Sequence, residues 1–283
     1  VYGDLLVAED GVPETQLLPG FGVAITREGQ KPGGERYGLS THGFWIPMRD
    51  LRRVAAPTFR GGAVGDALDV AWVNVDKAHP RKAPGATPSR DVLARQTRLQ
   101  VLETSELGGK KWLRVGDAQW LPASELLQPS RVARPPEVKA GEHWFDVELA
   151  TQTLIAYVGD HPVFTTLVST GRGAEGTVLA TPKGIHRVWV KLASSDMDNL
   201  ENLEANENYA IQAVPWVMYF EKGYGLHGTF WHHAFGRVQS HGCVNLSPAD
   251  AERLFNWASP RLPSGWTAAL PTVYERGSLV RVR

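Results

Sequence analysis

The chain has 283 residues, a single cysteine, a net charge of zero and no long apolar run. One cysteine cannot form a disulfide within the chain, so a disulfide-stabilised scaffold is excluded. Thirty basic residues balance thirty acidic ones, so no net field attracts nucleic acid or an anionic membrane, and we expect no nucleic-acid partner. No apolar stretch approaches the roughly 20 residues that span a bilayer, and we expect no membrane span. The 42% of hydrophobic residues predicts folded domains with real cores.

Two segments of the N-terminal half repeat at an offset of 75 residues. The stretch GFWIPMRDL at residues 43–51 returns as AQWLPASEL at residues 118–126, with Trp45 matching Trp120. A fixed offset of this size indicates that a small domain has been duplicated. Runs in which polar and apolar residues alternate, separated by glycine-rich turns, predict that each copy is built from β-strands.

The two copies resemble bacterial SH3-like domains, and we expect small barrels over residues 1–60 and 61–135. Trp45 and Trp120 are then core residues of the two barrels, and a wall-binding or ligand-binding groove is the alternative. A proline-rich stretch follows and introduces a third domain over residues 142–283. Every residue assigned to chemistry below lies in this third domain, so a modular organisation predicts that it keeps the activity by itself.

The C-terminal part is again strand-like from Trp144 onward, with one exception. The stretch SPADAERLFNWA predicts a helix that begins at Ser247 or Pro248. Its apolar residues fall on one face: Ala251, Leu254, Phe255 and Ala258. The expected fold class is therefore mainly β, with two small SH3-like barrels followed by a β-rich domain that carries a short helix after the cysteine.

Residues 227–245 read HGTFWHHAFGRVQSHGCVN and contain the only cysteine with four of the nine histidines. Cys243 could be a nucleophile, a zinc ligand or a buried thiol. Lone thiols are often buried, but this one lies among polar and flexible residues. A free thiol with a pKa of about 8.5 needs a neighbour such as imidazole to ionise near neutrality, and the histidines supply it. The N–H groups of Gly242 and Cys243 could face a developing oxyanion, so the pattern favours acyl transfer.

Zinc is the competing interpretation because histidine and cysteine side chains are its usual ligands. Structural zinc sites usually pair their ligands in two separated clusters, whereas this segment has one cysteine. His232 and His233 are adjacent, so on a strand they would point to opposite faces. The spacing argues against zinc, although a zinc-dependent hydrolase stays an alternative, and so does a binding protein without catalytic activity.

The HG pair, the SHGC segment and the following VNLSPADAERLF resemble the signature of the L,D-transpeptidase catalytic domain, the YkuD-like family. The TPKG stretch at residues 181–184 is similar to the Thr-Pro-x-Gly turn of that family. The resemblance implies a cysteine that attacks peptidoglycan stem peptides, forms a thioester and releases a terminal D-amino acid. An amine acceptor from a second stem peptide, a D-amino acid or a protein then takes the acyl group.

No cofactor and no metal are implied by the resemblance. It also implies a location in the cell envelope, periplasmic or exported, with the export signal not present in this chain. Cys243 is expected to be the nucleophile and His227 its general base, with the carbonyl of Gly228 orienting the imidazole. His241 is expected to shape the site and tune the thiolate.

Five residues are expected at the oxyanion or substrate: Gly242, Ser240, Asn245, Arg237 and Tyr209. Ser240 is expected to hold the loop by local hydrogen bonds. Many family members carry arginine where this chain has Asn245, so Arg237 is considered as a replacement charge for a substrate carboxylate. Tyr209 stands where some members place a tyrosine near the oxyanion hole.

Overall fold

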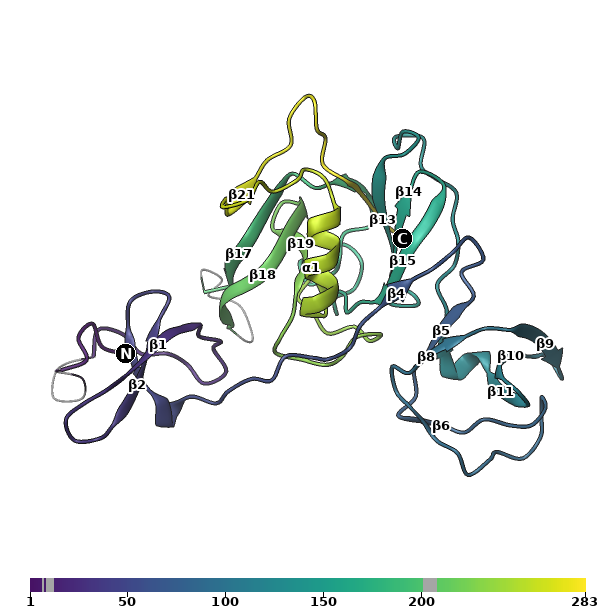
Figure 1. Ribbon diagram of the computed structural model, residues 1–283, viewed down its shortest axis with the longest axis horizontal. Helices are drawn as coiled ribbons and strands as arrows, with labels where there is room; N and C mark the ends of the chain where they lie inside the picture. Colours follow the sequence, from purple (N-terminus) through teal and green to yellow (C-terminus); the bar gives the residue numbers. More distant parts are fainter. Residues whose placement is uncertain (7, 9–12, 201–207) are drawn as a thin grey trace.

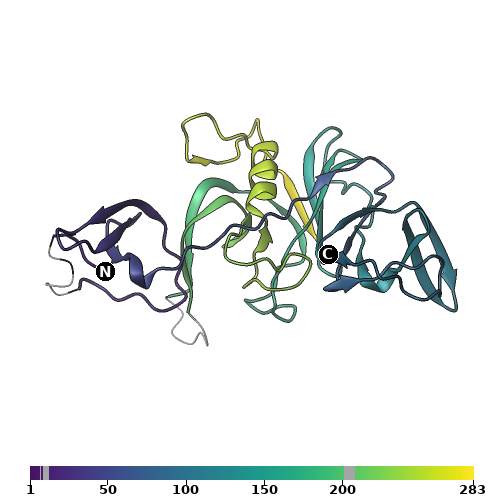
Figure 2. The same cartoon turned by 60° about the horizontal axis from the view of Figure 1, so that its bottom comes forward.

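The computed structural model describes residues 1–6, 8, 13–200 and 208–283. It has three β-rich bodies, and the C-terminal domain lies between the two N-terminal units (Figure 1). A view turned by 60° has the same arrangement (Figure 2). The fold is mainly β, as predicted, and α1 is the one α-helix among the described residues.

The first unit is one antiparallel sheet with the strand order β1-β2-β3. Its elements are β1 (Ile25–Gln30), β2 (Arg36–Ser40), β3 (Trp45–Pro47) and the short 3-10 helix η1 (Met48–Asp50). Tyr37 and Trp45 are buried in its small core together with Ala8. A backbone bridge from Tyr2 to Trp45 closes the sheet against the start of the chain.

The second unit has three small sheets, ordered β11-β10-β9, β12-β5-β8 and β6-β7. Its elements are β5 (Val70–Val73), β6 (Lys77–Ala78), β7 (Leu93–Ala94), β8 (Arg98–Gln100), β9 (Glu103–Leu107), β10 (Lys110–Gly116), β11 (Gln119–Pro122), η2 (Ala123–Glu125) and β12 (Leu126–Leu127). The proline-rich residues 79–90 form the long connection between β6 and β7.

The duplication seen in the sequence is repeated in the strand register. Pro47 pairs with Tyr37 in the first unit, and Pro122 pairs with Trp112 in the second. Both pairs differ by the same 75 residues, and a 3-10 helix follows each of them. In the first unit the described residues form one sheet, whereas β12 and β5 add strand pairing in the second.

Two sheets make the C-terminal domain, with strand orders β16-β22-β13-β14-β15-β4 and β20-β19-β18-β17-β21. The first contains β4 (Gly62–Ala63), β13 (His143–Glu148), β14 (Thr153–Val158), β15 (His161–Leu167), β16 (Gly184–Arg187) and β22 (Leu279–Val282). The second contains β17 (Val190–Asp198), β18 (Ala210–Glu221), β19 (Tyr224–Gly228), β20 (Val244–Leu246) and β21 (Ala268–Ala269). Buried residues of both sheets form one core.

The helix α1 (Pro248–Trp257) begins where the sequence predicts. The Ser247 hydroxyl accepts from the backbone N–H of Asp250 at 3.2 Å, which satisfies a donor of the first turn. Its four apolar residues from the predicted face, Ala251, Leu254, Phe255 and Ala258, are at most 1% exposed. Because these side chains pack into the common core, the helix fixes the strands on either side of it.

The connection between the two N-terminal units crosses the C-terminal domain beside α1 (Figures 1 and 2). The backbone N–H of Gly61 donates to both carboxylate oxygens of Asp250, at 3.1 and 2.9 Å. β4 then pairs with β15, so the expected second domain begins with a strand of another sheet. The two repeated units are thus separated in space although they follow one another in the chain.

Candidate active site

The parallel pair β19 and β20 brings the histidine and the cysteine together. His227 on β19 lies opposite Asn245 on β20. Side chains alternate along a strand, so Cys243, two residues before Asn245, faces the same side of the sheet as Asn245. Both Cys243 and His227 line a cavity of about 600 Å³. Six of the nine predicted site residues line this cavity: Tyr209, His227, Ser240, His241, Cys243 and Asn245.

Cys243 is partly exposed and immediately precedes β20. Its Sγ lies 3.8 Å from the carbonyl oxygen of Gly223. Burial raises the pKa of the thiol to about 11, because a thiolate loses hydration there. This shift runs against the expectation that nearby histidine lets the thiol ionise near neutrality, and it favours a neutral thiol in the resting site.

His227 is only 2% exposed, and burial lowers the pKa of its imidazole to about 4. Its Nδ1 lies 3.3 Å from the carbonyl oxygen of Gly228. A carbonyl can only accept, so Nδ1 carries the proton and Nε2 keeps its lone pair. The ring of Trp231 stacks against the imidazole at 5.8 Å between centroids. The neutral ring is thus held in the tautomer that a general base needs.

Ser240 closes the loop that carries the cysteine. Its hydroxyl donates to the carbonyl oxygen of Cys243 at 2.5 Å and accepts from the N–H of Gly242 at 3.0 Å. The structure therefore contains the local hydrogen bonds expected of Ser240. It also corrects the expectation for Gly242, because its N–H is directed at Ser240 instead of an oxyanion.

Gly242 is a position where only glycine fits. Its φ is +127°, and a Cβ there would lie 2.4 Å from Cε1 of Tyr224. The hydroxyl of Thr181, in the TPKG stretch, donates to the carbonyl oxygen of Gly242 at 2.7 Å. It also accepts from the N–H of Gly171 at 2.8 Å. Thr181 thereby ties the cysteine loop to the neighbouring strand segment.

His241 lies between an arginine and an aromatic ring. The guanidinium of Arg172 donates to its Nε2 at 2.9 Å, and the ring of Tyr209 stacks on it at 4.8 Å between centroids. Burial raises the pKa of Tyr209 to about 12, and the negative charge that Cys243 carries in its thiolate form adds to this shift. Sequence reasoning missed Arg172, which lines the cavity; the available signal was a lone arginine in the glycine turn TGRG.

Arg237 does not have the role considered for it. Its guanidinium donates to the carboxylate of Asp76 at 3.1 Å and to the carbonyl oxygen of Asn74 at 3.4 Å. Both partners belong to the second unit, and Arg237 is not among the residues that line the catalytic cavity. The arginine that lines the cavity is Arg172. Arg237 lies six residues before Cys243 in the chain, but this spacing did not determine which way its loop turns.

His232 uses both ring nitrogens in hydrogen bonds. Nδ1 accepts from the N–H of Ala234 at 3.1 Å, and Nε2 lies 2.8 Å from the side-chain amide of Asn245. Burial lowers the pKa of His232 to about 4. Among the described residues, no group of three or more His, Cys, Asp or Glu side chains is placed to hold a metal ion. The histidine cluster is therefore organised by hydrogen bonds.

The loop that carries His232 is held by the second unit. Arg95 donates to the carbonyl oxygen of Phe235 at 2.6 Å. Gln96 donates to the carbonyl oxygens of His233 and Phe235, both at 2.9 Å. Phe235 is fully buried in a small core shared with Trp72 of the second unit. The prediction that residues 142–283 keep the activity by themselves did not take these contacts into account, and a fragment without the second unit would lose them.

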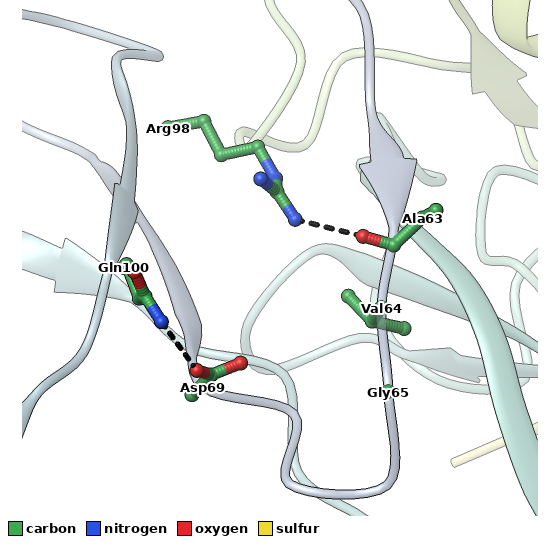
Figure 3. A pocket seen from close by; sticks show the side chains of 6 residues that line it. All are labelled: Ala63, Val64, Gly65, Asp69, Arg98 and Gln100. Carbon is green, nitrogen blue, oxygen red and sulfur yellow. Dashed lines mark hydrogen bonds between the residues drawn. The ribbon is translucent and has the colours of Figure 1, made fainter.

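A smaller cavity of about 320 Å³ lies between β4 and the second unit (Figure 3). Arg98 donates there to the carbonyl oxygen of Ala63 at 3.0 Å, and Gln100 donates to Asp69 at 2.9 Å. None of its six lining residues is a cysteine, histidine, serine or threonine. The larger cavity is accordingly the candidate active site.

Residues 142–280 match the YkuD family, described as the L,D-transpeptidase catalytic domain. No curated protein matches the chain. None of the described helices is long and apolar enough to cross a membrane.

The chain is similar to several solved structures. A mutant L,D-transpeptidase of Enterococcus faecium is 22% identical, with 50% of each chain covered and a TM-score of 0.37. L,D-transpeptidase 1 of Mycobacterium tuberculosis is 19% identical over 50% of this chain and 61% of that one, with a TM-score of 0.36. An L,D-transpeptidase of Mycobacterium smegmatis is 15% identical over 95% of this chain and 97% of that one, with a TM-score of 0.39. The chain thus spans half the length of the first of these structures.

Proposed function

We propose that this chain is a peptidoglycan L,D-transpeptidase with Cys243 as its nucleophile, because residues 142–280 match the L,D-transpeptidase catalytic domain of the YkuD family. One observation carries the assignment of the residues. Cys243 and His227 come from the paired β19–β20 region and line the same cavity. A thiol and its general base must face the same space, and this shared cavity supports the pairing of Cys243 with His227.

In the first half-reaction, Nε2 of His227 takes the thiol proton while Sγ of Cys243 attacks the carbonyl carbon of the stem peptide. The new C–S bond produces a tetrahedral oxyanion, whose collapse breaks the peptide C–N bond. The imidazolium returns its proton to the leaving amino group. The products are a thioester on Cys243 and a free terminal D-amino acid.

In the second half-reaction, the amino group of an acceptor attacks the thioester carbonyl and loses its proton to His227. The C–S bond then breaks, the thiol recovers its proton, and a new amide is released. The acceptor belongs to a second stem peptide, a D-amino acid or a protein. Water as acceptor would give simple cleavage, because acceptor choice depends on the shape of the cavity.

Both partners of the proposed proton transfer are uncharged in the resting site. The thiol has a pKa of about 11 and the imidazole of His227 about 4, so both groups are neutral near pH 7. An imidazole in this state accepts the proton as the C–S bond forms. The carbonyl of Gly228 holds the Nδ1 proton and so stabilises the imidazolium that follows.

Two further groups complete the proposed site. Tyr209, with its pKa raised to about 12, stays protonated and can donate a hydrogen bond to the oxyanion. Arg172 contacts His241 and supplies positive charge at the cavity, where the stem peptide brings a carboxylate. We assign Asn245 to the wall of the cavity, where His232 holds its side-chain amide.

We also propose that the two repeated units are SH3-like modules at residues 1–60 and 61–135, and that the protein acts in the cell envelope. The repeated register of Trp45 and Trp120 supports a common architecture for the units. The envelope location follows from the proposed substrate, since peptidoglycan is found there.

The proposal is tested by incubating the protein with a muropeptide that carries a tetrapeptide stem, with and without a D-amino acid as acceptor. Mass spectrometry is expected to detect loss of the terminal residue and, with acceptor, a product that contains it. A Cys243→Ala protein is the control. If the parent protein binds the muropeptide but gives no product under any acceptor, the alternative of a silent binding protein replaces this one.

A further inference from the structure

The catalytic cavity is not lined by the C-terminal domain alone. Gly20, which belongs to the first unit, lines it together with Cys243. Met197 on β17 and Ile211 on β18 lie on the same cavity. A residue more than 200 positions before the nucleophile thus borders the space in which the substrate would react.

The segment around Gly20 is docked by backbone pairing. The N–H of Gly22 donates to the carbonyl oxygen of Ala210 at 2.8 Å, and the N–H of Gln212 donates to the carbonyl oxygen of Gly22 at 2.9 Å. Gly22 therefore pairs in parallel with Ile211, so the segment lies alongside the first residues of β18. Such pairing fixes the position of the segment along the strand.

Side chains fix the same contact from a second direction. The amide oxygen of Gln212 accepts from the N–H of Ala24 at 3.1 Å and from the hydroxyl of Thr41 at 3.2 Å. His42 of the first unit lies 2.5 Å from the carboxylate of Asp196 on β17. Since contacts from two parts of the first unit hold the β17–β18 hairpin, the position of Gly20 at the cavity is determined.

Gly20 has no side chain that would narrow the cavity at this part of its rim. Its φ is +93°, and no heavy atom of the described residues lies within 4 Å of the place where a Cβ would stand. The residue itself is exposed at the rim. The first atom of a larger side chain would therefore stand beside the cavity without meeting any described residue.

We propose that the first unit is one wall of the substrate cleft and that Gly20 is a specificity-determining position at its rim. This inference rests on the proposed function, since the substrate class is the peptide stem of peptidoglycan. The part of the stem next to the reacting carbonyl passes along the rim of the cavity beside Gly20. The glycine sets how large a group can follow that path to Cys243.

The test compares Gly20→Trp with Gly43→Trp in the full chain. Gly43 is a matched control because its φ is +83° and, in the part of the chain that the structure describes, no heavy atom lies within 4 Å of its Cβ position. It also occupies a turn of the same unit. It is not among the residues that line the cavity. The pair Gly20→Asn and Gly43→Asn repeats the comparison with a residue that tolerates positive φ. The asparagine pair provides the comparison if either tryptophan variant fails to fold.

Two readouts separate this inference from the proposed function. The first is the rate at which Cys243 is alkylated by small iodoacetamide and by a bulky fluorescein maleimide, which requires no turnover. The second is kcat/KM for the tetrapeptide-stem muropeptide. For Gly20→Trp we expect the bulky reagent to react about fivefold more slowly and kcat/KM to fall about tenfold, as for a steric change in a binding pocket. Iodoacetamide should react at nearly the parent rate.

The same rates in Gly20→Trp and Gly43→Trp for both reagents would overturn the inference, whether or not the muropeptide is turned over. If only the bulky reagent reacts more slowly in Gly20→Trp and the parent protein turns over no muropeptide, the first unit is still a wall of the cleft, but the proposed function is rejected. Equal losses in the two tryptophan variants and in the two asparagine variants would also overturn it, because they would trace the effect to the unit as a whole.

Discussion

The imidazole of His232 lies 2.8 Å from the side-chain amide of Asn245, and this contact joins the loop held by the second unit to the strand that follows the cysteine. The loop is anchored on its other side by Arg95 and Gln96. The second unit therefore reaches the cavity through two consecutive sets of hydrogen bonds, although its own residues do not line it.

Removing the Gln96 side chain should impair turnover. Gln96→Ala deletes two hydrogen bonds to the loop, at His233 and Phe235, and we expect kcat to fall about tenfold because a catalytic loop is less well positioned. KM should change less than kcat. Gln100→Ala is the control, since Gln100 bonds Asp69 within the second unit. Equal kcat values for the two variants would contradict the anchoring role.

Cys243→Ala should abolish turnover, by more than about a thousandfold, because no thioester can form. The loss of one small, partly exposed thiol leaves the fold intact, so the far-UV circular dichroism spectrum and the melting temperature should match those of the parent. Muropeptide assays by mass spectrometry provide the measurement. Retained turnover would remove the thioester mechanism.

The pH dependence of thiol alkylation should reflect the buried environment of Cys243. Burial raises the pKa to about 11, so the reactive thiolate is a minor species near neutrality. The rate with iodoacetamide should therefore keep rising about tenfold per pH unit from pH 7 to 10, whereas a free thiol levels off above its pKa of about 8.5. A plateau below pH 9 would contradict the neutral resting thiol.

Gly242→Ala should reduce activity more than stability alone explains. The new Cβ would meet the ring of Tyr224 at 2.4 Å, and the φ of +127° disfavours any side chain, with a cost of about 1–3 kcal/mol. The cysteine loop must shift, so we expect at least about a tenfold loss of kcat/KM. Gly265→Ala controls for backbone strain, since its φ is +81° with open surroundings. Similar activity in the two variants would reject the steric argument.

Asp250→Ala should destabilise the protein. Its carboxylate is 3% exposed and accepts from the N–H of Gly61 and the hydroxyl of Thr166, the latter at 2.6 Å. Leaving these buried donors unpaired costs about 2–4 kcal/mol in the free energy of unfolding. Urea denaturation provides the measurement, and Glu252→Ala, in the exposed part of the same helix, is the control. A loss below that of the control would mean that the connector is held by other contacts.

The sequence by itself determined the strand-rich class, the helix after the cysteine and the repeat. These features are local, because alternation, capping residues and glycine turns act within a few residues of one another. The helix begins after Ser247, as predicted. Trp45 and Trp120 occupy the same position in the strand pairing of their units. The sequence also placed Cys243 and His227 in one short segment, and residues 142–280 match the family that this segment resembles.

Only the tertiary structure decided which distant residues surround that segment. Arg237 turns to Asp76 of the second unit, whereas Arg172 and Gly20 reach the cavity from other parts of the chain. The pKa of Cys243 was likewise unreadable from neighbouring histidines, because burial sets it and burial depends on how both sheets and α1 pack. Spacing along the chain constrains local geometry, but the contacts between residues 18–24, 74–96 and 210–245 form only when the three bodies dock.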